Sequence, residues 1–214
     1  MQGIKFNDIH SYRDLNLVLA PFQMPPATPK TNFIDVPGAD GSIDASESLG
    51  EIKFNDRTGN FVFSVLPSDD FEEKKTQISN LLNGLKCKII LDKDPEFYYL
   101  GRLMVNDYKA NKKLRQITID FRVQPYKLKK NVTTVDVAPK TSKTTQTVIL
   151  KNNRMSIVPT ITTTKDTTIT FGDAVIKMNA GTHKFLNIYL KQGENPITVE
   201  SEGVVTFTYQ EGAL

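Results

Sequence analysis

The sequence predicts a mainly β protein made of two β-sandwich domains, the first of which carries a single α-helix. Three observations lead to this prediction: apolar and polar residues alternate along several segments, one segment has helical spacing, and the composition changes after Lys130. Alternation with a period of two is typical of half-buried antiparallel strands. We therefore expect a first domain at residues 1–130 and a smaller second domain at residues 131–214.

Strands of the first domain are predicted most clearly at residues 60–66 and 115–123. Their large apolar side chains share one face of each segment, namely Phe61, Phe63 and Val65 in the first and Ile117, Ile119, Phe121 and Val123 in the second. Residues 98–105 also have a strand-like pattern, and the lysines at 109–113 lie between this segment and the strand at 115–123. This order predicts a hairpin with a charged loop.

One helix is predicted at about residues 69–83. Asp69 and Glu72 have the spacing of a capping box, with Asp in place of the usual Ser or Thr. A single apolar stripe follows, formed by Phe71, Ile78, Leu81 and Leu82. Gly84 is well placed to end the helix in a left-handed conformation.

The second domain is rich in threonine, with thirteen among the forty residues from Asn131 to Thr170. Short strands are expected at residues 145–150, 157–161, 167–171, 185–190 and 204–209. Turns are expected between them at 172–173, 179–181 and 193–196. This spacing is typical of a β-sandwich or a jelly roll.

Charge and composition exclude several classes of protein. A formal net charge of +3 is too small to indicate a nucleic-acid or membrane partner. The first residues lack the pattern of a signal peptide, so synthesis in a cytoplasm without secretory export is expected. The single cysteine, Cys87, lies in an apolar run and is interpreted as a small core residue rather than a catalytic thiol.

Residue patterns for catalysis are missing from the sequence. His10 and His183 are isolated, and neither a serine-nucleophile elbow nor a glycine-rich phosphate loop is found. The chain is therefore not expected to be an enzyme or to bind a cofactor or a metal ion.

The segment Asp35–Gly50 is the one place where a metal site is considered as an alternative, and a structural connection is the preferred interpretation. Its carboxylates, with that of Glu51, are Asp35, Asp40, Asp44, Glu47 and Glu51. Several oxygens are what calcium requires, although the EF-hand spacing is not met. The other interpretation is a structural connection, in which glycines adopt positive φ and aspartates bond to their own backbone. A glycosidase carboxylate pair is a third and weaker interpretation.

The order of short motifs along the chain resembles the distal tail proteins (Dit) of long-tailed bacteriophages and prophage-derived tail particles. The motifs are Gly3–Asn7, His10–Tyr12, Leu15–Leu19, Val36–Asp44, Asn55–Arg57, Phe61–Phe63, Leu81–Gly84, Tyr98–Arg102, Gln124–Lys127 and Val205–Leu214. Together they cover essentially the whole chain, and their order is more specific than any one of them.

The resemblance implies a structural protein of the virion tail tip, made in the bacterial host cytoplasm. Residues 1–130 would form a hexameric ring, and the galectin-like residues 131–214 would project outward. The implied partners are other copies of the chain, the tail tube protein and the tail-associated hub protein, with fibres or receptor-binding proteins attached later. DNA and the tape-measure protein would only pass through the lumen, and no membrane contact is implied.

The resemblance also implies structural or interface roles for particular residues, which are Asp35, Pro37, Gly38, Asp40, Gly41, Asp44, Arg57, Gly101, Arg102, Pro125 and Tyr126. The second domain has about 84 residues and lacks a long insertion that could grip receptor-binding proteins. An alternative is a carbohydrate-binding, lectin-like module with Tyr189 and Tyr209 as sugar platforms. A cell-wall hydrolase is the third hypothesis.

Overall fold

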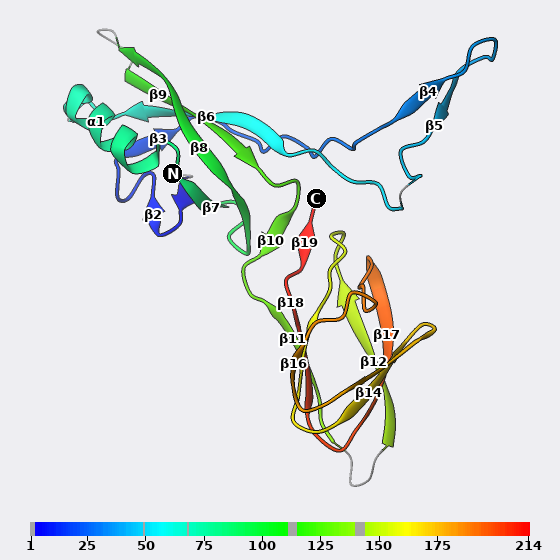
Figure 1. Ribbon diagram of the computed structural model, residues 1–214. Helices are drawn as coiled ribbons and strands as arrows, with labels where there is room; N and C mark the ends of the chain where they lie inside the picture. The colour runs from blue at the N-terminus through cyan, green and yellow to red at the C-terminus, as the bar shows by residue number, and fades with distance from the viewer. Residues whose placement is uncertain (1–2, 49, 68, 111–114, 140–143) are drawn as a thin grey trace. The chain divides into compact units, whose positions relative to one another are not determined.

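The computed structural model describes residues 3–48, 50–67, 69–110, 115–139 and 144–214, and it confirms the predicted mainly β fold class (Figure 1). Among these residues, α1 (Phe71–Leu82) is the single α-helix. The chain divides into two compact units, Met1–Lys127 and Leu128–Leu214, and the division falls within the short strand β10 (Lys127–Lys129).

The first unit is built on one curled antiparallel sheet with the strand order β2-β1-β7-β8-β9-β6-β3. In chain order the strands are β1 (Ile4–Phe6), β2 (Ile9–His10), β3 (Leu17–Leu19), β6 (Arg57–Val65), β7 (Lys86–Leu91), β8 (Phe97–Ala110) and β9 (Arg115–Val123). A separate hairpin, β4 (Phe33–Asp35) with β5 (Ser42–Asp44), lies between β3 and β6 in the sequence.

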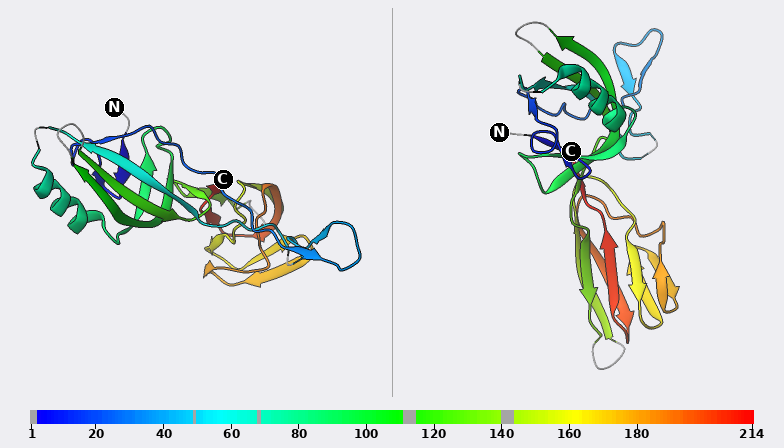
Figure 2. Two further views of the ribbon diagram at one scale, coloured as in Figure 1. Left: turned by 90° about the horizontal axis from the view of Figure 1, so that it is seen from above. Right: turned by 90° about the vertical axis from the view of Figure 1, so that its left-hand side faces the viewer.

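One face of this sheet carries the core. The apolar side chains predicted to share a face on β6 and β9 are all buried, and Phe61 stacks on Phe121 with ring centroids 4.5 Å apart. Ile78 and Leu82 of α1 are fully buried against the same cluster, and the helix runs along one side of the sheet in Figure 2. Alternation places the polar residues of the same strands on the outer face.

The helix begins at Phe71, two residues after the predicted start, and its N-cap lies one residue later than expected. Asp70, not Asp69, is the N-cap, and its side chain accepts a hydrogen bond of 2.8 Å from the backbone N–H of Glu73. The carboxylate of Asp69 instead lies 3.2 Å from the ammonium of Lys74. Gly84 has the predicted left-handed conformation, with φ of +77°.

The second unit consists of two four-stranded antiparallel sheets with a core between them. One has the order β11-β18-β13-β16 and the other β12-β17-β14-β15. The strands are β11 (Thr133–Val137), β12 (Thr144–Asn152), β13 (Thr160–Thr163), β14 (Thr167–Phe171), β15 (Ala174–Met178), β16 (Gly181–His183), β17 (Gly193–Ser201) and β18 (Val205–Tyr209). The short strand β19 (Gly212–Ala213) pairs with β10.

Three predictions for the second unit were wrong. Residues 157–161 are not one strand, because β13 begins only at Thr160 and Ile157 makes an isolated bridge. Residues 185–190 do not form a strand: within them only Leu190 makes an isolated bridge, to Ile157, although Ile188 and Leu190 are fully buried. Burial of a loop therefore produced the apolar pattern. Residues 193–196, predicted as a turn, begin β17. Pro196 is tolerated there because β14 pairs with β17 only from Thr198 onward.

Many threonines of the second unit lie on strands with their side chains facing outward, although Thr163 and Thr167 are buried and their hydroxyl groups bond to each other. Thr162 and Thr182 lie on neighbouring strands with their hydroxyl oxygens 3.1 Å apart, and Thr147 and Thr198 are a second such pair at 3.3 Å. Cross-strand pairs of this kind stabilise sheets, and β-branched side chains fit the pleated surface. The threonine content is thus explained by the strands themselves.

Gly101 on β8 marks the tightest point of the first unit's sheet. It lies between Cys87 on β7 and Val123 on β9. A Cβ atom at this position would stand 2.3 Å from the carbonyl oxygen of Arg122 and 2.6 Å from the Cα of Val123. Both are backbone atoms, so the clash could not be relieved by rotating a side chain.

Replacing Gly101 with Ala is expected to destabilise the protein by about 1–3 kcal/mol, because the backbone of β9 must shift to admit a methyl group. Thr58→Ala, at an exposed position of the neighbouring strand β6, is the control and should change stability by less than about 0.5 kcal/mol. Urea unfolding followed by circular dichroism measures both. Equal stabilities of the Gly101→Ala variant and the wild type would contradict the close approach.

Candidate functional site

The segment Asp35–Gly50 lies in a hairpin that extends from the first unit, and we call residues 28–55 the arm. At the arm's base the backbone runs antiparallel, with Lys30 N–H donating to Lys53 O at 2.7 Å and Asn55 N–H to Thr28 O at 2.8 Å. The hairpin β4–β5 follows and stands clear of the sheet (Figures 1 and 2). Its register pairs Ile34 with Ile43.

The arm has the features expected of a structural connection, namely glycines with positive φ and aspartates that bond to nearby residues. Gly38 and Gly41 have φ of +84° and +72° in the turn between the strands, a conformation that favours glycine. Asp35 accepts a hydrogen bond of 2.6 Å from the hydroxyl of Ser42. Ser46 donates both side-chain and backbone hydrogen bonds to Asp44, and these bonds lower the pKa of that carboxyl below its usual value.

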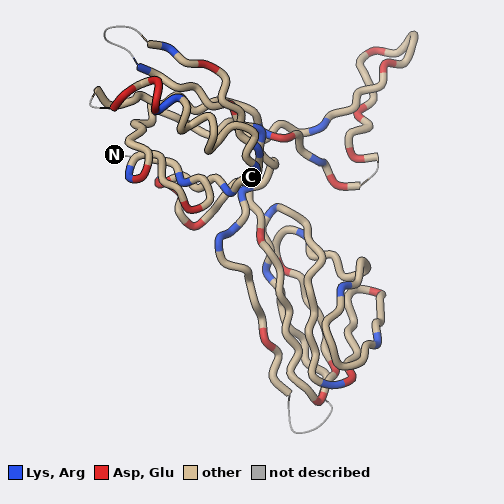
Figure 3. The backbone as a smooth tube through the Cα atoms, turned by 60° about the vertical axis from the view of Figure 1, so that its left-hand side comes forward, with Lys and Arg blue, Asp and Glu red and all other residues tan. Residues whose placement is uncertain are grey.

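The arm exposes apolar side chains that its own unit leaves in water. Phe33 and Ile43 are each 59% exposed, and Ile34 is 48% exposed. Ile34 and Ile43 share one face of the hairpin and Phe33 lies on the other, so each face carries an exposed apolar side chain. Exposed apolar side chains gathered on one segment typically mark a surface that another molecule covers. The arm is also acidic, since residues 31–52 contain five carboxylates and no lysine or arginine; in Figure 3, blue appears only toward its base.

Arg57 fixes the root of the arm. Its side chain is buried, with Nε donating to Pro125 O at 2.7 Å and Nη1 to Pro25 O at 2.8 Å. Its guanidinium lies 5.5 Å from the ring centroid of Tyr99. Since Pro25 precedes the arm and Pro125 follows the last long strand of the sheet, one side chain ties both segments to β6.

Tyr126 reinforces the same root. Its ring meets that of Phe54 at a centroid distance of 5.9 Å, in an edge-on arrangement. Phe54 in turn forms an isolated bridge with Pro29, across the base of the arm. The arm therefore leaves the sheet in a direction that packing determines.

Gly101 and Arg102 lie elsewhere, on the sheet. The side chain of Arg102 is exposed on the outer face of β8 and donates a hydrogen bond to Gly84 O. The eleven residues that the resemblance implies are thus divided among three places. Asp35, Pro37, Gly38, Asp40, Gly41 and Asp44 belong to the arm, Arg57, Pro125 and Tyr126 to its root, and Gly101 and Arg102 to the sheet.

Two polar clusters were missed by the sequence reasoning. His10 is not an isolated histidine: its Nε2 lies 3.1 Å from an oxygen of Asp92, and its Nδ1 accepts backbone N–H bonds from Tyr12 and Arg13. In the second unit, Glu211 accepts hydrogen bonds from Lys129 and Asn153, each at 2.9 Å, and from Thr133. His10 and Asp92 are 82 residues apart in the sequence, as are Lys129 and Glu211. No local sequence pattern could therefore have predicted either cluster.

The residues considered for other functions have ordinary surroundings. Tyr209, a predicted sugar platform, is buried in the core of the second unit and donates to Lys151 O at 2.6 Å. Among the described residues, His, Cys, Asp and Glu side chains do not gather in any group of three able to hold a metal ion. The described helix is also too short and too polar to cross a membrane.

Arg57→Met is expected to destabilise the protein by about 1–3 kcal/mol, because the partly buried carbonyl groups of Pro25 and Pro125 lose their charged donor. Arg57→Lys should recover only part of this loss, since an ammonium cannot reproduce the two directions of the guanidinium. Chemical unfolding of both variants beside the wild type is the measurement. A loss below about 0.5 kcal/mol for Arg57→Met would contradict an anchoring role.

Cys87 gives a pH-dependent prediction. Burial raises the pKa of its thiol from the usual 9.0 to about 11. The unfolded chain therefore ionises this thiol first, so its contribution to stability is complete below pH 9 and declines as the pH rises toward 11. The difference in unfolding free energy between the wild type and Cys87→Ala should shrink over that range. A difference that stays constant would contradict the burial of the thiol.

Comparisons with models of known protein families and with curated protein sequences give no match. Among solved structures, the chain is similar to the crystal structure of SPP1 Dit (gp 19.1), described as a paradigm of the hub adsorption apparatus in phages that infect Gram-positive bacteria. The TM-score is 0.69 at 14% sequence identity, over 98% of this chain and 99% of that chain. The chain therefore has the fold of this phage distal tail protein over both of its units.

Proposed function

We propose that this chain is a distal tail protein, a structural component of the tail tip of a long-tailed phage or a related tail particle. The observation that carries the proposal is the similarity of fold over nearly the full length of both proteins. A match of one sandwich alone would be weak support, because sandwiches serve many unrelated functions. Here both units and their order along the chain are similar to those of the phage protein.

The arm supports assembly as the mode of action. A monomer would leave Phe33, Ile34 and Ile43 in water, whereas a neighbouring copy can cover them. Contacts between different surfaces of identical chains close into a ring when the rotation between neighbours divides the circle. Residues 1–130 form a hexameric ring in this proposal, and residues 131–214 project from it.

The partners follow from that position. The ring joins the tail tube protein on one side and the tail-associated hub protein on the other, with fibres or receptor-binding proteins added later. DNA and the tape-measure protein pass through its lumen. The role is architectural and not enzymatic, and the chain reaches the virion tail tip from the host cytoplasm.

Phe33→Ser combined with Ile43→Ser is expected to prevent ring formation while leaving the fold intact. Both side chains are exposed, so their replacement should change the unfolding free energy by less than about 0.5 kcal/mol per site. Light scattering is the test, with a mass of six chains expected for the wild type and a smaller mass for the variant. A suitable control is Val175→Ser, because Val175 is 62% exposed on the second unit. A double variant that retains the wild-type mass would contradict assembly through the arm.

A further inference from the structure

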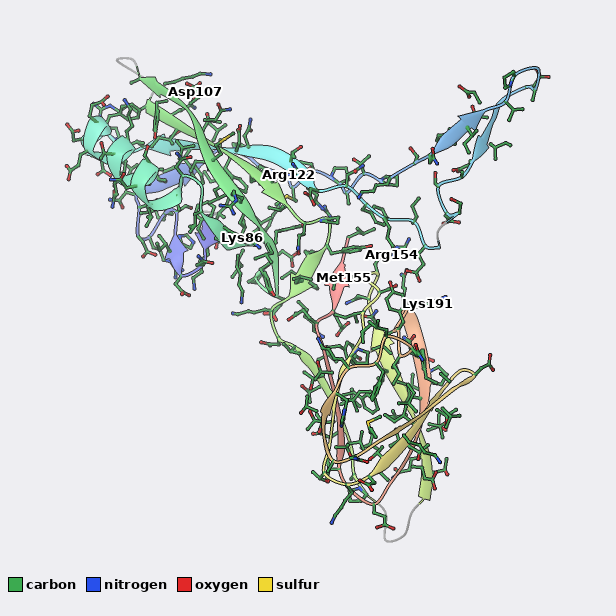
Figure 4. The ribbon with its side chains drawn as sticks, in the orientation of Figure 1. Lys86, Asp107, Arg122, Arg154, Met155 and Lys191 are labelled. Atoms are coloured by element: carbon green, nitrogen blue, oxygen red, sulfur yellow. The ribbon has the colours of Figure 1, made fainter. Side chains whose placement is uncertain are left out.

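One edge of the second unit's sandwich is formed by the long strand β12. This strand lies at the end of the sheet β12-β17-β14-β15 and pairs with β17 over all nine of its residues. Figure 4 labels Arg154, which follows β12, and Lys191, which precedes β17, beyond the end of this pairing. On its other side β12 has no neighbour among the described strands. We call that side the free edge.

Pro196 shows which backbone groups of β12 point to the free edge. Residues opposite each other on antiparallel strands alternate between pairs that exchange hydrogen bonds and pairs that do not. Pro196 of β17 has no N–H and lies opposite Ile149. This pair is therefore of the kind without hydrogen bonds, and the N–H and C=O of Ile149 point away from β17. With a period of two, the same holds for Thr145, Thr147 and Lys151.

The turn between β14 and β15 leads to the same alternation. Phe171 and Ala174 close a two-residue turn, in which the C=O of the first residue accepts a hydrogen bond from the N–H of the fourth. Phe171 therefore faces β15, and its neighbour Thr170 faces β17, where it lies opposite Thr198. Thr198 and Pro196 are two residues apart on β17, so both direct their backbone groups away from β12.

The middle of the free edge is not used by the protein's own hydrogen bonds. The carbonyl oxygen of Lys151 accepts a hydrogen bond of 2.6 Å from the hydroxyl of Tyr209. Within the described residues, the N–H and C=O groups that Thr147 and Ile149 direct to this edge have no partner. The side chain of Ile149 is also 50% exposed. These two residues therefore offer donors and acceptors in the arrangement that another strand would need.

The other edge strands of the main sheets are protected against pairing, whereas β12 is not. β2, β3 and β16 contain only two or three residues each. β11 and β15 have five residues each and carry the charged residues Asp136 and Lys177. Short edges and charged edges are means by which proteins prevent strand addition. β12 has nine residues, and its segment Thr144–Leu150 contains no charged residue, proline or glycine.

A small pocket opens beside the free edge, and we call it the slot. It has a volume of about 250 Å³ and lies between residues 136–139 and residues 146–148 of β12. Gln146 donates a hydrogen bond of 3.0 Å to the carbonyl oxygen of Ala138, which ties its two sides together. Val137, Pro139 and Val148 add apolar side chains to the lining. In strand addition, backbone bonds provide affinity and pockets of this kind select alternate side chains.

We propose that β12 binds an extended segment of another protein, which pairs with the free edge at Thr147 and Ile149 and places an apolar side chain in the slot. The segment is uncharged in its middle and apolar at alternate positions, because only one of its faces meets the slot. The identity of the partner rests on the proposed function: in a tail tip, this segment belongs to a different tail protein.

A second copy of this chain is a poorer occupant of the free edge. Antiparallel pairing of β12 with β12 of another copy would be self-complementary and would have a two-fold axis. Neighbours in a single ring are related by a heterologous contact, which has no such axis. Pairing with β11 or β15 of a neighbour would cover little more than half of β12, because those strands have five residues each.

A synthetic peptide tests the proposal on the full chain. The probe is a labelled nine-residue peptide with lysine at both ends and threonine alternating with valine between them. Fluorescence anisotropy should show that it binds the wild type. Thr147→Pro should weaken binding by about tenfold, because it removes an N–H from the free edge and none that bonds to β17. Thr147→Ala is the matched control, since it loses the same hydroxyl but keeps the N–H, and should bind within about twofold of the wild type.

The peptide itself can be varied to test the slot. A peptide with serine in place of each valine keeps the same backbone and should bind more weakly than the valine peptide, because the slot is lined mainly by apolar groups. Equal binding of the two peptides would overturn the role of the slot.

Amide hydrogen exchange gives a second measurement that needs no variant. In the wild type alone, the N–H groups of Thr147 and Ile149 should exchange quickly, whereas those of Val148 and Leu150, which face β17, should exchange slowly. Addition of the valine peptide should slow exchange at Thr147 and Ile149. Slow exchange at all four residues before the peptide is added would overturn the proposal.

The remaining outcomes separate this proposal from the ring. A wild type that does not bind the peptide at about 1 mM, or equal binding by Thr147→Pro and Thr147→Ala, would overturn the proposal even if the ring forms. A mass in light scattering that falls in Thr147→Pro and not in Thr147→Ala would overturn it in favour of a contact between copies. A monomeric wild type that binds the peptide would contradict the ring and support the binding of a strand by β12.

Discussion

The pairing register of β7, β8, β9 and β6 is the constraint on which the rest of the first unit depends. A slip of one residue would move Ile117, Ile119 and Phe121 from the core to the outer face. The same register brings Arg102 beside Arg122 on that outer face, and it places Gly101 where a side chain would meet the backbone of β9. The buried core and the pairing of Arg102 with Arg122 on the outer face thus both follow from one alignment of strands.

The arm has the opposite character, because little of its stability can come from burial. Its hairpin keeps its shape through turn glycines and short side-chain bonds, while Phe33 and Ile43 remain in water. Arg57 donates hydrogen bonds to the backbone of Pro25 and Pro125 at the root of the arm. These bonds fix the direction of the arm but do not bury its side chains. A rigid root and an exposed apolar end are properties that suit assembly better than catalysis, and the similarity of fold to a phage distal tail protein agrees with that interpretation.

The sequence predicts those parts of the fold that depend on local periodicity. Residues 115–123 alternate and form β9, and the apolar side chains at positions 61, 63 and 65 all lie on β6. The helix was placed to within two residues at its start because its apolar stripe is regular. Residues 185–190 show the limit, since a buried loop can be as apolar as a strand. The pairing of His10 with Asp92 and the alignment of Lys86 with Arg102 join distant segments, so only the strand register reveals them.

The account predicts that a ring is the functional form of the chain. Neighbouring copies in this ring contact each other through the arm. Electron microscopy of the purified full chain, without other tail proteins, tests this most directly. Class averages with six-fold symmetry and a central opening are the predicted result. Isolated particles of the size of a single 24.0 kDa chain, at concentrations where an assembling protein is fully associated, would contradict the account.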